Sequence, residues 1–436
     1  MERLRAGVIG VGAIAQIMHL PYLRELDDRF QIAALCDVDP VVLAEVGRQY
    51  GVDRLFASAD ELLNEPLDVV LILSSGDHGP VTIAALERGL HVLVEKPLAY
   101  TLRETDDVIA TAERAGKTLM VGMMKQYDPG YQRGVELVQR LHDLRYVEAT
   151  TLEPEGTLYH AHHPIVRSGE PHSHQEERYG AEMFNSIQKD ILASQPRDLL
   201  REATGSDDPA VLTSYFLLLV SSIHDVNALR GAIGQPECVL SANLWAGGTS
   251  FTTTLAYPND VRAVYTWTML PYVKNYGETF GFYASDGRVL IRFPSPYLRN
   301  APTLVDVERM HGEELQVTRF TTSYEEAFKR ELLEFDDCVR NGRTPRTDAP
   351  GFRQDLEVLT EIARVLRPGG RVVTVTTDSR RPVTRRLLER LPRSSGLRAL
   401  DPAREFDTSG LRPLRARFVP SGWPSLCVRG KRPSNA

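Results

Sequence analysis

The segment His91-Val92-Leu93-Val94-Glu95-Lys96-Pro97 carries the residues best suited to chemistry. An apolar run that ends in an acid, a base and a proline is typical of a buried parallel strand, which delivers charged side chains to its carboxyl edge. Ligands of open α/β sheets bind at that edge. Pro97 restricts Lys96 and permits a cis bond between them, so we expect the ammonium to be held in place. A solvated strand exit would explain Glu-Lys-Pro equally well, so the surrounding chain must decide.

A glycine-rich turn near the N-terminus is the second candidate. A strand from Arg5 to Ile9 runs into Gly10-Val11-Gly12-Ala13-Ile14-Ala15, and a helical pattern follows. Gly10 permits a tight turn, Gly12 leaves room for a pyrophosphate, and the helix N-terminus faces the phosphates. This setting predicts a dinucleotide site. The residues that we expect to contact the dinucleotide are Gly10, Gly12, Ala13, Ile14, Asp37, Ser74, Glu95 and Lys96.

Asp37 decides which dinucleotide the turn favours. It ends a second strand, Gln31 to Cys36, near the position of the acid that bonds the ribose 2′-hydroxyl. A carboxylate there would repel a 2′-phosphate, so the sequence favours NAD over NADP. A turn or cap role explains Asp37 equally well.

The strand–helix alternation continues up to a strand at Thr118 to Met124. It predicts an α/β fold, a doubly wound parallel sheet of Rossmann type spanning residues 1–124. From residue 125 the pattern changes to antiparallel strands, with Asp286-Gly287 as a hairpin signal, followed by helices at Tyr324 to Arg340 and Phe352 to Leu366. We therefore expect a second, α+β domain over residues 125–366.

His224 lies in the middle of a strongly apolar helical stretch, Tyr215 to Arg230. A satisfied core histidine is one explanation, and an acid/base group is the other. A polar stretch over residues 153–210 interrupts the second domain and holds five histidines. Their spacing matches no metal cradle, so we expect an irregular surface insert and no metal, and an insert of this length beside an active site could act as a lid.

Composition excludes several classes of function. The chain has 436 residues and a net charge of −7, which offers no general attraction to nucleic acid or to anionic membranes. Four scattered cysteines without metal-ligand spacing favour a reduced, cytoplasmic protein. The apolar run Tyr215 to Val220 is too short to cross a bilayer.

Taken together, the motifs resemble the Gfo/Idh/MocA family, the glucose-fructose oxidoreductase and inositol dehydrogenase group. The resemblance covers about residues 5–366 without the insert. It rests on the Gly10-Gly12-Ala15 turn, the segment from His91 to Pro97, Tyr127-Asp128-Pro129, Ile223-His224-Asp225, and Phe328 to Val339 before Thr344-Pro345. It implies an open-faced, mainly antiparallel substrate and oligomerisation domain with helices on one side, catalytic Lys96 and His224, and substrate contacts from the segment of Lys125 and Tyr127, with Asp225 beside the histidine.

Two positions depart from that family. Many family dehydrogenases carry an aspartate four residues before the histidine, and here that residue is Val220. A loop that often reads Thr-Pro-Asn is Ser75-Gly76-Asp77 here. Loss of the helix carboxylate removes an orienter of the imidazole, so His224 works alone, takes another partner, or has given up proton transfer.

The C-terminal extension, residues 367–436, is foreign to the family. Its start and end resemble the last part of a class I methyltransferase, but no second glycine-rich cofactor turn precedes it. We interpret it as a fused remnant that packs on the body or on a partner. An arginine-rich, largely disordered extension is the alternative.

These features predict an NAD(P)-dependent dehydrogenase that acts on CH–OH groups of a sugar, cyclitol or related polyol. The resemblance also favours a homo-oligomer, either a dimer or a tetramer. Two other hypotheses stay open: a reductase of an imine, enone or tetrapyrrole, and a non-catalytic dinucleotide-binding regulator or scaffold. Substrate identity and reaction direction are not fixed by the sequence.

Overall fold

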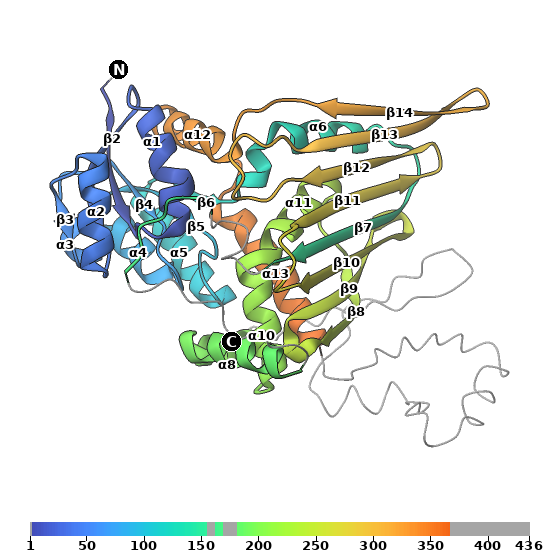
Figure 1. Ribbon diagram of the computed structural model, residues 1–436, viewed down its shortest axis with the longest axis horizontal. Coiled ribbons are helices and arrows are strands. Elements are labelled where there is room, and N and C mark those ends of the chain that lie inside the picture. The colour runs from blue at the N-terminus through green and yellow to red at the C-terminus, as the bar shows by residue number, and fades with distance from the viewer. Residues whose placement is uncertain (1, 155–161, 169–180, 367–436) are drawn as a thin grey trace.

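The computed structural model describes residues 2–154, 162–168 and 181–366. Within them the chain forms two sheets, with the N-terminal sheet and its helices on the left of Figure 1 and a larger sheet on the right. The predicted fold class, a Rossmann sheet followed by a second sheet domain, is confirmed. The C-terminal extension and two parts of the predicted insert, residues 155–161 and 169–180, lie outside the described residues.

The N-terminal sheet has six parallel strands in the order β3-β2-β1-β4-β5-β6. The strands are β1 (Leu4–Ile9), β2 (Phe30–Cys36), β3 (Leu55–Phe56), β4 (Val69–Ile72), β5 (His91–Glu95) and β6 (Leu119–Gly122). The order reverses between β1 and β4, so the crevice for a ligand is expected there, at the carboxyl ends of the strands.

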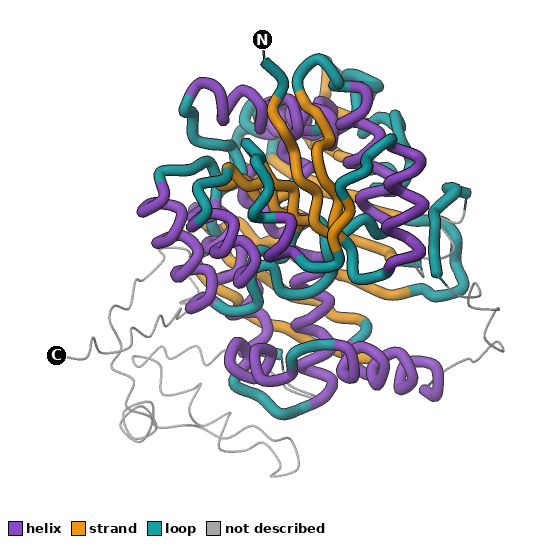
Figure 2. Tube along the Cα trace, turned by 90° about the vertical axis from the view of Figure 1, so that its left-hand side faces the viewer, coloured by secondary structure: helices purple, strands orange, loops and turns teal. Residues whose placement is uncertain are grey.

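Helices cover both faces of this sheet, as Figure 2 shows. They are η1 (Ala15–His19), α1 (Leu20–Glu25), α2 (Pro40–Tyr50), α3 (Ala59–Leu62), α4 (Gly79–Glu87) and α5 (Leu102–Ala115). Because both faces are covered, β4 is buried along its whole length and reads as a continuous apolar run. Gly116 ends α5 in the left-handed conformation, which glycine adopts without steric cost.

The second sheet has eight strands in the order β14-β13-β12-β11-β7-β10-β9-β8. They are β7 (Leu144–Glu153), β8 (Cys238–Trp245), β9 (Ser250–Tyr257), β10 (Val261–Met269), β11 (Gly277–Ala284), β12 (Gly287–Phe293), β13 (Leu304–His311) and β14 (Glu314–Thr321). The sheet is mainly antiparallel, as predicted, but β7 and β10 run parallel. β11 runs antiparallel to β7, so the carboxyl end of β7 and the start of β11 lie together on the side of the N-terminal domain (Figure 1).

The helices of the second half are η2 (Met124–Tyr127), α6 (Pro129–Val138), α8 (Ala181–Ser194), α9 (Arg197–Thr204), α10 (Pro209–Leu217), η3 (Leu218–Ser222), α11 (Ile223–Ile233), α12 (Ala327–Asn341) and α13 (Ala349–Val365). Short 3₁₀ turns, η4 (Ala246–Gly248) and η5 (Pro258–Asp260), flank β9. α6 packs on β12 and β13, and α13 packs on β8. α12 packs instead on α1 and η2, so it ties the two halves together.

The apolar stretch predicted as a helix from Tyr215 is longer than expected. α10, η3 and α11 form one continuous helix, Pro209–Ile233, which begins at the N-cap Asp208. Its length and composition would suffice to cross a membrane, but 67% of its apolar window is buried inside the structure. It is therefore a core helix. Its π-turn, η3, carries one residue more than an α-helical turn. The side chains of α11 are therefore rotated about the helix axis relative to a regular continuation of α10.

The prediction that residues 153–210 are irregular is wrong for residues 181–210, whereas residues 162–168 contain no helix or strand, as predicted. α8, α9 and the start of α10 lie in this stretch. α9 is strongly polar in sequence, yet it buries Leu200 and Ala203, and Arg103 of α5 pairs with Glu202. Tertiary contacts therefore stabilise a helix that an overall polar composition hides.

Candidate active site

The glycine turn lies where β1, β4 and η1 meet. Gly10 has φ +88°, and a Cβ on it would lie 2.4 Å from the backbone nitrogen of Ser74. Only glycine fits there. A Cβ on Gly12, by contrast, would meet no protein atom within 4 Å. Space is therefore open at the position where a pyrophosphate would approach the helix N-terminus.

Asp37 supports this turn from the end of β2. Its Oδ2 accepts the Val11 N–H at 2.8 Å, and its Oδ1 accepts the Asp39 N–H at 2.9 Å. The carboxylate is thus fixed beside the turn, and both oxygens already accept backbone hydrogen bonds. A turn role for Asp37, the alternative considered from the sequence, accounts for these contacts. A contact between Asp37 and the cofactor ribose stays a proposal.

A cavity of about 530 Å³ opens beside the turn, between the two sheets. The predicted residues that line it are Gly12, Ala13, Ile14, Ser74, Glu95, Lys96, Lys125, His224 and Asp225. Gly10, Asp37 and Tyr127 are not among its lining residues. Tyr127 is buried instead, and its hydroxyl bonds Thr347 Oγ1 at 2.8 Å. The structure therefore does not bring Tyr127 to the cavity.

Lys96 follows β5 and lines the cavity. The peptide bond between Lys96 and Pro97 is cis. Its Nζ donates to the carbonyl of Val220 at 2.6 Å. That carbonyl belongs to the π-turn η3, so Val220 holds the lysine through its backbone. Burial lowers the pKa of Lys96, while Glu95 and Glu153 oppose the shift.

His224 lines the same cavity from α11. Burial, together with the charges of Lys96 and Lys125, lowers its pKa well below 6.5. Its Nδ1 is buried and has no hydrogen-bond partner among the described residues. The imidazole is therefore neutral at physiological pH and able to accept a proton.

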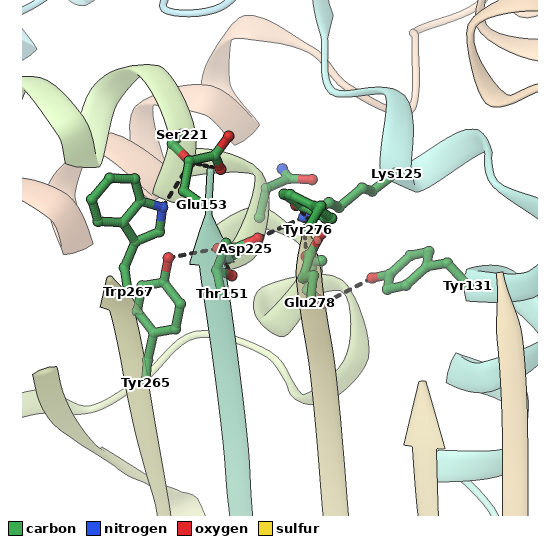
Figure 3. Close-up of polar contacts among 12 residues, drawn as sticks. Lys125, Tyr131, Thr151, Glu153, Ser221, Asp225, Tyr265, Trp267, Tyr276 and Glu278 are labelled. Atoms are coloured by element: carbon green, nitrogen blue, oxygen red, sulfur yellow. Dashed lines mark hydrogen bonds and ion pairs between the residues drawn. The ribbon is translucent and has the colours of Figure 1, made fainter. Parts of the chain in front are cut away.

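Lys125 lines the cavity and is buried between two carboxylates, Asp225 and Glu278 (Figure 3). Its Nζ lies 2.5 Å from Asp225 Oδ1 and also pairs with Glu278. Asp225 Oδ2 accepts from Thr151 and Tyr265 at 2.8 Å and 2.5 Å. The charges of Lys125 and Asp225 are therefore largely satisfied within the protein.

The acids of this cluster titrate differently. Burial would raise the pKa of Asp225, but Lys125 and the hydrogen bonds outweigh it and hold the pKa below its usual value. Burial raises the pKa of Glu278 to about 8, with Asp225 adding to the rise and Lys125 opposing it. Tyr276 donates to the other oxygen of Glu278 at 2.7 Å. At neutral pH, Glu278 is thus the acid of the pair that holds a proton.

Three residues of the site were not predicted: Glu153, Glu278 and His19. Glu153 and Glu278 line the cavity from the neighbouring strands β7 and β11. His19 lies behind the cavity and bonds Glu95. A polar residue between the apolar Met18 and Leu20 is a signal that would have found His19. Nothing local marks the two glutamates, because strand pairing brings them to the site.

One described part of the predicted insert, residues 162–168, lies along the helix that follows the glycine turn. The Val166 N–H donates to Gln16 Oε1 at 2.8 Å, and Gln16 Nε2 donates to the Val166 carbonyl at 3.1 Å. His163 Nε2 bonds the Tyr297 carbonyl at 2.6 Å. A lid role remains a prediction. No histidine, cysteine or carboxylate cluster that could hold a metal occurs in the ranges that the structure describes.

Comparisons with known proteins agree with this geometry. Residues 4–123 match the Gfo/Idh/MocA oxidoreductase family, NAD-binding Rossmann fold. Over 138 residues the chain is 33% identical to myo-inositol 2-dehydrogenase of Thermotoga maritima, covering 31% of this chain and 41% of that protein. It is 34% identical over 134 residues to an NADP(+) D-xylose 1-dehydrogenase of Haloferax volcanii, covering 30% and 41%. The match spans about two fifths of these relatives.

The fold likeness extends further. A solved 3-ketoreductase of Actinomadura kijaniata in complex with NADP superposes with a TM-score of 0.63 at 18% identity, covering 84% of this chain and 99% of that one. The predicted family resemblance is therefore supported by sequence in the N-terminal domain, which is an NAD(P)-binding Rossmann domain. The second domain shares the fold. The methyltransferase-like extension lies outside the described residues.

Proposed function

We propose that this protein is an NAD(P)-dependent oxidoreductase that interconverts a secondary alcohol and a ketone on a sugar, cyclitol or related polyol. Residues 1–124 would bind the dinucleotide and residues 125–366 the substrate. The observation that carries the proposal is that Lys96 and His224 line one cavity with the open turn at Gly12. The relatives whose sequences match the N-terminal part of the chain are named as an inositol dehydrogenase and a xylose dehydrogenase. These names support a polyol as substrate.

The residues present fit a dinucleotide. Gly12 leaves open space, and the helix that begins after it offers free backbone N–H groups to a pyrophosphate. The nicotinamide, when bound, exchanges a hydride with the carbinol carbon. Asp37 and Asp39 place two carboxylates at the end of β2, which favours NAD over NADP because they repel a 2′-phosphate.

The remaining chemistry belongs to the chain. Lys96 would donate a hydrogen bond to the reacting oxygen and stabilise its alkoxide character, which is worth most in a cavity that excludes water. His224, neutral at physiological pH, would take the hydroxyl proton. A neutral histidine beside a cationic lysine is the arrangement that alcohol oxidation needs.

A labelled-substrate experiment tests this function. The protein is incubated with deuterium-labelled polyols and NAD⁺, and separately with ketosugars, imines and enones and deuterated NADH. Deuterium exchanged between a polyol carbinol carbon and the nicotinamide is the expected result. Transfer to an imine or enone alone would make the protein a reductase of another class. Cofactor binding with no transfer in any panel would favour the non-catalytic regulator.

The variant His224→Asn tests the assignment of the base. We expect kcat/KM to fall about 100-fold, because general base catalysis contributes at least that much. The wild-type protein should lose activity only well below pH 6.5, where His224 becomes protonated, and the variant should lack this acidic limb. A pH–rate profile measures both. Activity within twofold of wild type with an unchanged acidic limb would remove His224 from the mechanism.

A further inference from the structure

A buried pair lies directly behind the proposed catalytic lysine. His19 Nε2 and Glu95 Oε1 are 2.8 Å apart, and the two side chains are 0% and 8% exposed. His19 comes from the π-turn η1 that follows the glycine turn, whereas Glu95 ends β5. The contact therefore joins the dinucleotide helix to the strand that carries Lys96.

The second oxygen of Glu95 holds Lys96 itself. Oε2 accepts the backbone N–H of Lys96 at 3.2 Å. It also lies close to β6, since a Cβ on Gly122 would be 3.3 Å from this atom. The carboxylate is thus packed tightly, with one oxygen on His19 and the other on the lysine backbone. Rotation of the Glu95 side chain would break both contacts.

The charges around this pair come from several elements. Glu95 faces His19 from η1 and Glu331 from α12, and the Phe328 ring of α12 contacts the edge of His19 at 5.4 Å between centroids. Burial, with Glu95 nearby, raises the pKa of Glu331 well above its usual value, so Glu331 is neutral. The charged and titratable groups that face Lys96 are Glu95, Glu153, Lys125 and His224.

We propose that His19 is a positioning residue, which holds the Glu95 carboxylate in place as the counter-charge that keeps Lys96 an ammonium. The inference rests on the proposed function, because it assigns a role to the ammonium of Lys96. Burial would raise the pKa of Glu95, and the His19 contact is the first of the interactions that lower it. Without His19, Glu95 takes up a proton more easily, and Lys96 loses the negative charge that most opposes the effect of burial.

The sign of the effect on activity follows directly. The ammonium form of Lys96 is the active one, so activity falls as pH rises through the pKa of Lys96. Loss of the Glu95 charge lowers that pKa further. The basic limb of the kcat/KM profile should therefore move to lower pH in His19→Leu, by about one unit. His19→Gln keeps a donor at a similar reach, so its profile should stay near that of the wild type.

The test uses the full chain and two measurements. The first is the pH profile of kcat/KM for wild type, His19→Leu, His19→Gln and Glu331→Gln. The second needs no turnover: NMR of protein labelled with ¹³C at lysine Cε follows the titration of Lys96, whose signal is identified by its absence in Lys96→Met. Glu331→Gln is the matched control, because it replaces a neutral buried acid near Glu95 with a neutral amide.

We expect both measurements to shift to lower pH in His19→Leu alone, while the melting temperature of His19→Gln and its NADH affinity stay near wild type. If His19→Leu leaves the NMR titration of Lys96 unchanged, or if His19→Gln shifts it equally, the positioning role is wrong. If the NMR titration shifts but no variant or wild-type protein turns over any substrate, the positioning role stands and the proposed function fails.

Discussion

Replacing Lys96 with methionine should lower kcat by about 100- to 10,000-fold and leave NADH binding unchanged. Methionine keeps much of the length of the side chain but removes the ammonium that would stabilise the reacting oxygen, and one donor of this kind is worth roughly that factor. The melting temperature should change little, because burial disfavours the Lys96 ammonium while Glu95 and Glu153 favour it.

Steady-state kinetics and a fluorescence titration with NADH measure the two effects separately. Lys189→Met is the control, because Lys189 is exposed on α8 and does not line the cavity. A variant at Lys96 that binds NADH normally and keeps full turnover would contradict the catalytic assignment. A variant that loses both would indicate that Lys96 serves cofactor binding instead.

Replacing Lys125 with methionine should destabilise the protein by about 3–5 kcal/mol. Lys125 is the cation between Asp225 and Glu278, and its Nζ also lies 4.8 Å from the centroid of the Phe293 ring. Removal of one partner leaves uncompensated charge in a buried site, which is the costly way to break a buried ion pair. The double variant Lys125→Met/Glu278→Gln should recover part of the loss, because one stranded carboxyl is then gone.

The loss should be larger at high pH. The folded pKa of Glu278 is about 8, above the ordinary value of 4.5, so its protonated form is preferred in the folded state. Stability from such a group is present at low pH and is lost as pH rises through the folded pKa. Without Lys125 both acids need protons, which steepens this dependence. Urea unfolding at pH 6 and at pH 8.5 measures it, and a loss under 1 kcal/mol at both would show that the cluster is not a structural unit.

The sequence predicted the parts of the site that are local in the chain. The turn at Gly10 and the strand that precedes Lys96 can each be recognised from a few consecutive residues. Glycine is required where φ is positive, and a continuous apolar run is typical of a buried parallel strand. Their meeting at one edge follows from the parallel sheet. The amino-acid pattern alone therefore suffices to expect these two residues near each other.

The parts that could not be predicted depend on distant pairing and on helix irregularities. Glu278 lies next to Lys125 only because β11 pairs with β7. These two strands are more than a hundred residues apart in the sequence, so no local pattern predicts their register. The π-turn η3 has no clear sequence signal, yet it presents the Val220 carbonyl to Lys96. The sequence shows that position 220 is valine and not aspartate, but it does not show that the Val220 carbonyl accepts a hydrogen bond from Lys96.

A titration of the purified protein with NADH, and separately with NADPH, tests the central claim most directly. Gly12→Val is the matched control, because a Cβ at Gly12 meets no protein atom within 4 Å and points into the space proposed for the pyrophosphate. We predict saturable binding of NADH that is tighter than that of NADPH, and at least tenfold weaker binding by the correctly folded Gly12→Val variant. Absence of saturable binding to either dinucleotide, or equal binding by the variant, would contradict the assignment of a dinucleotide-dependent oxidoreductase.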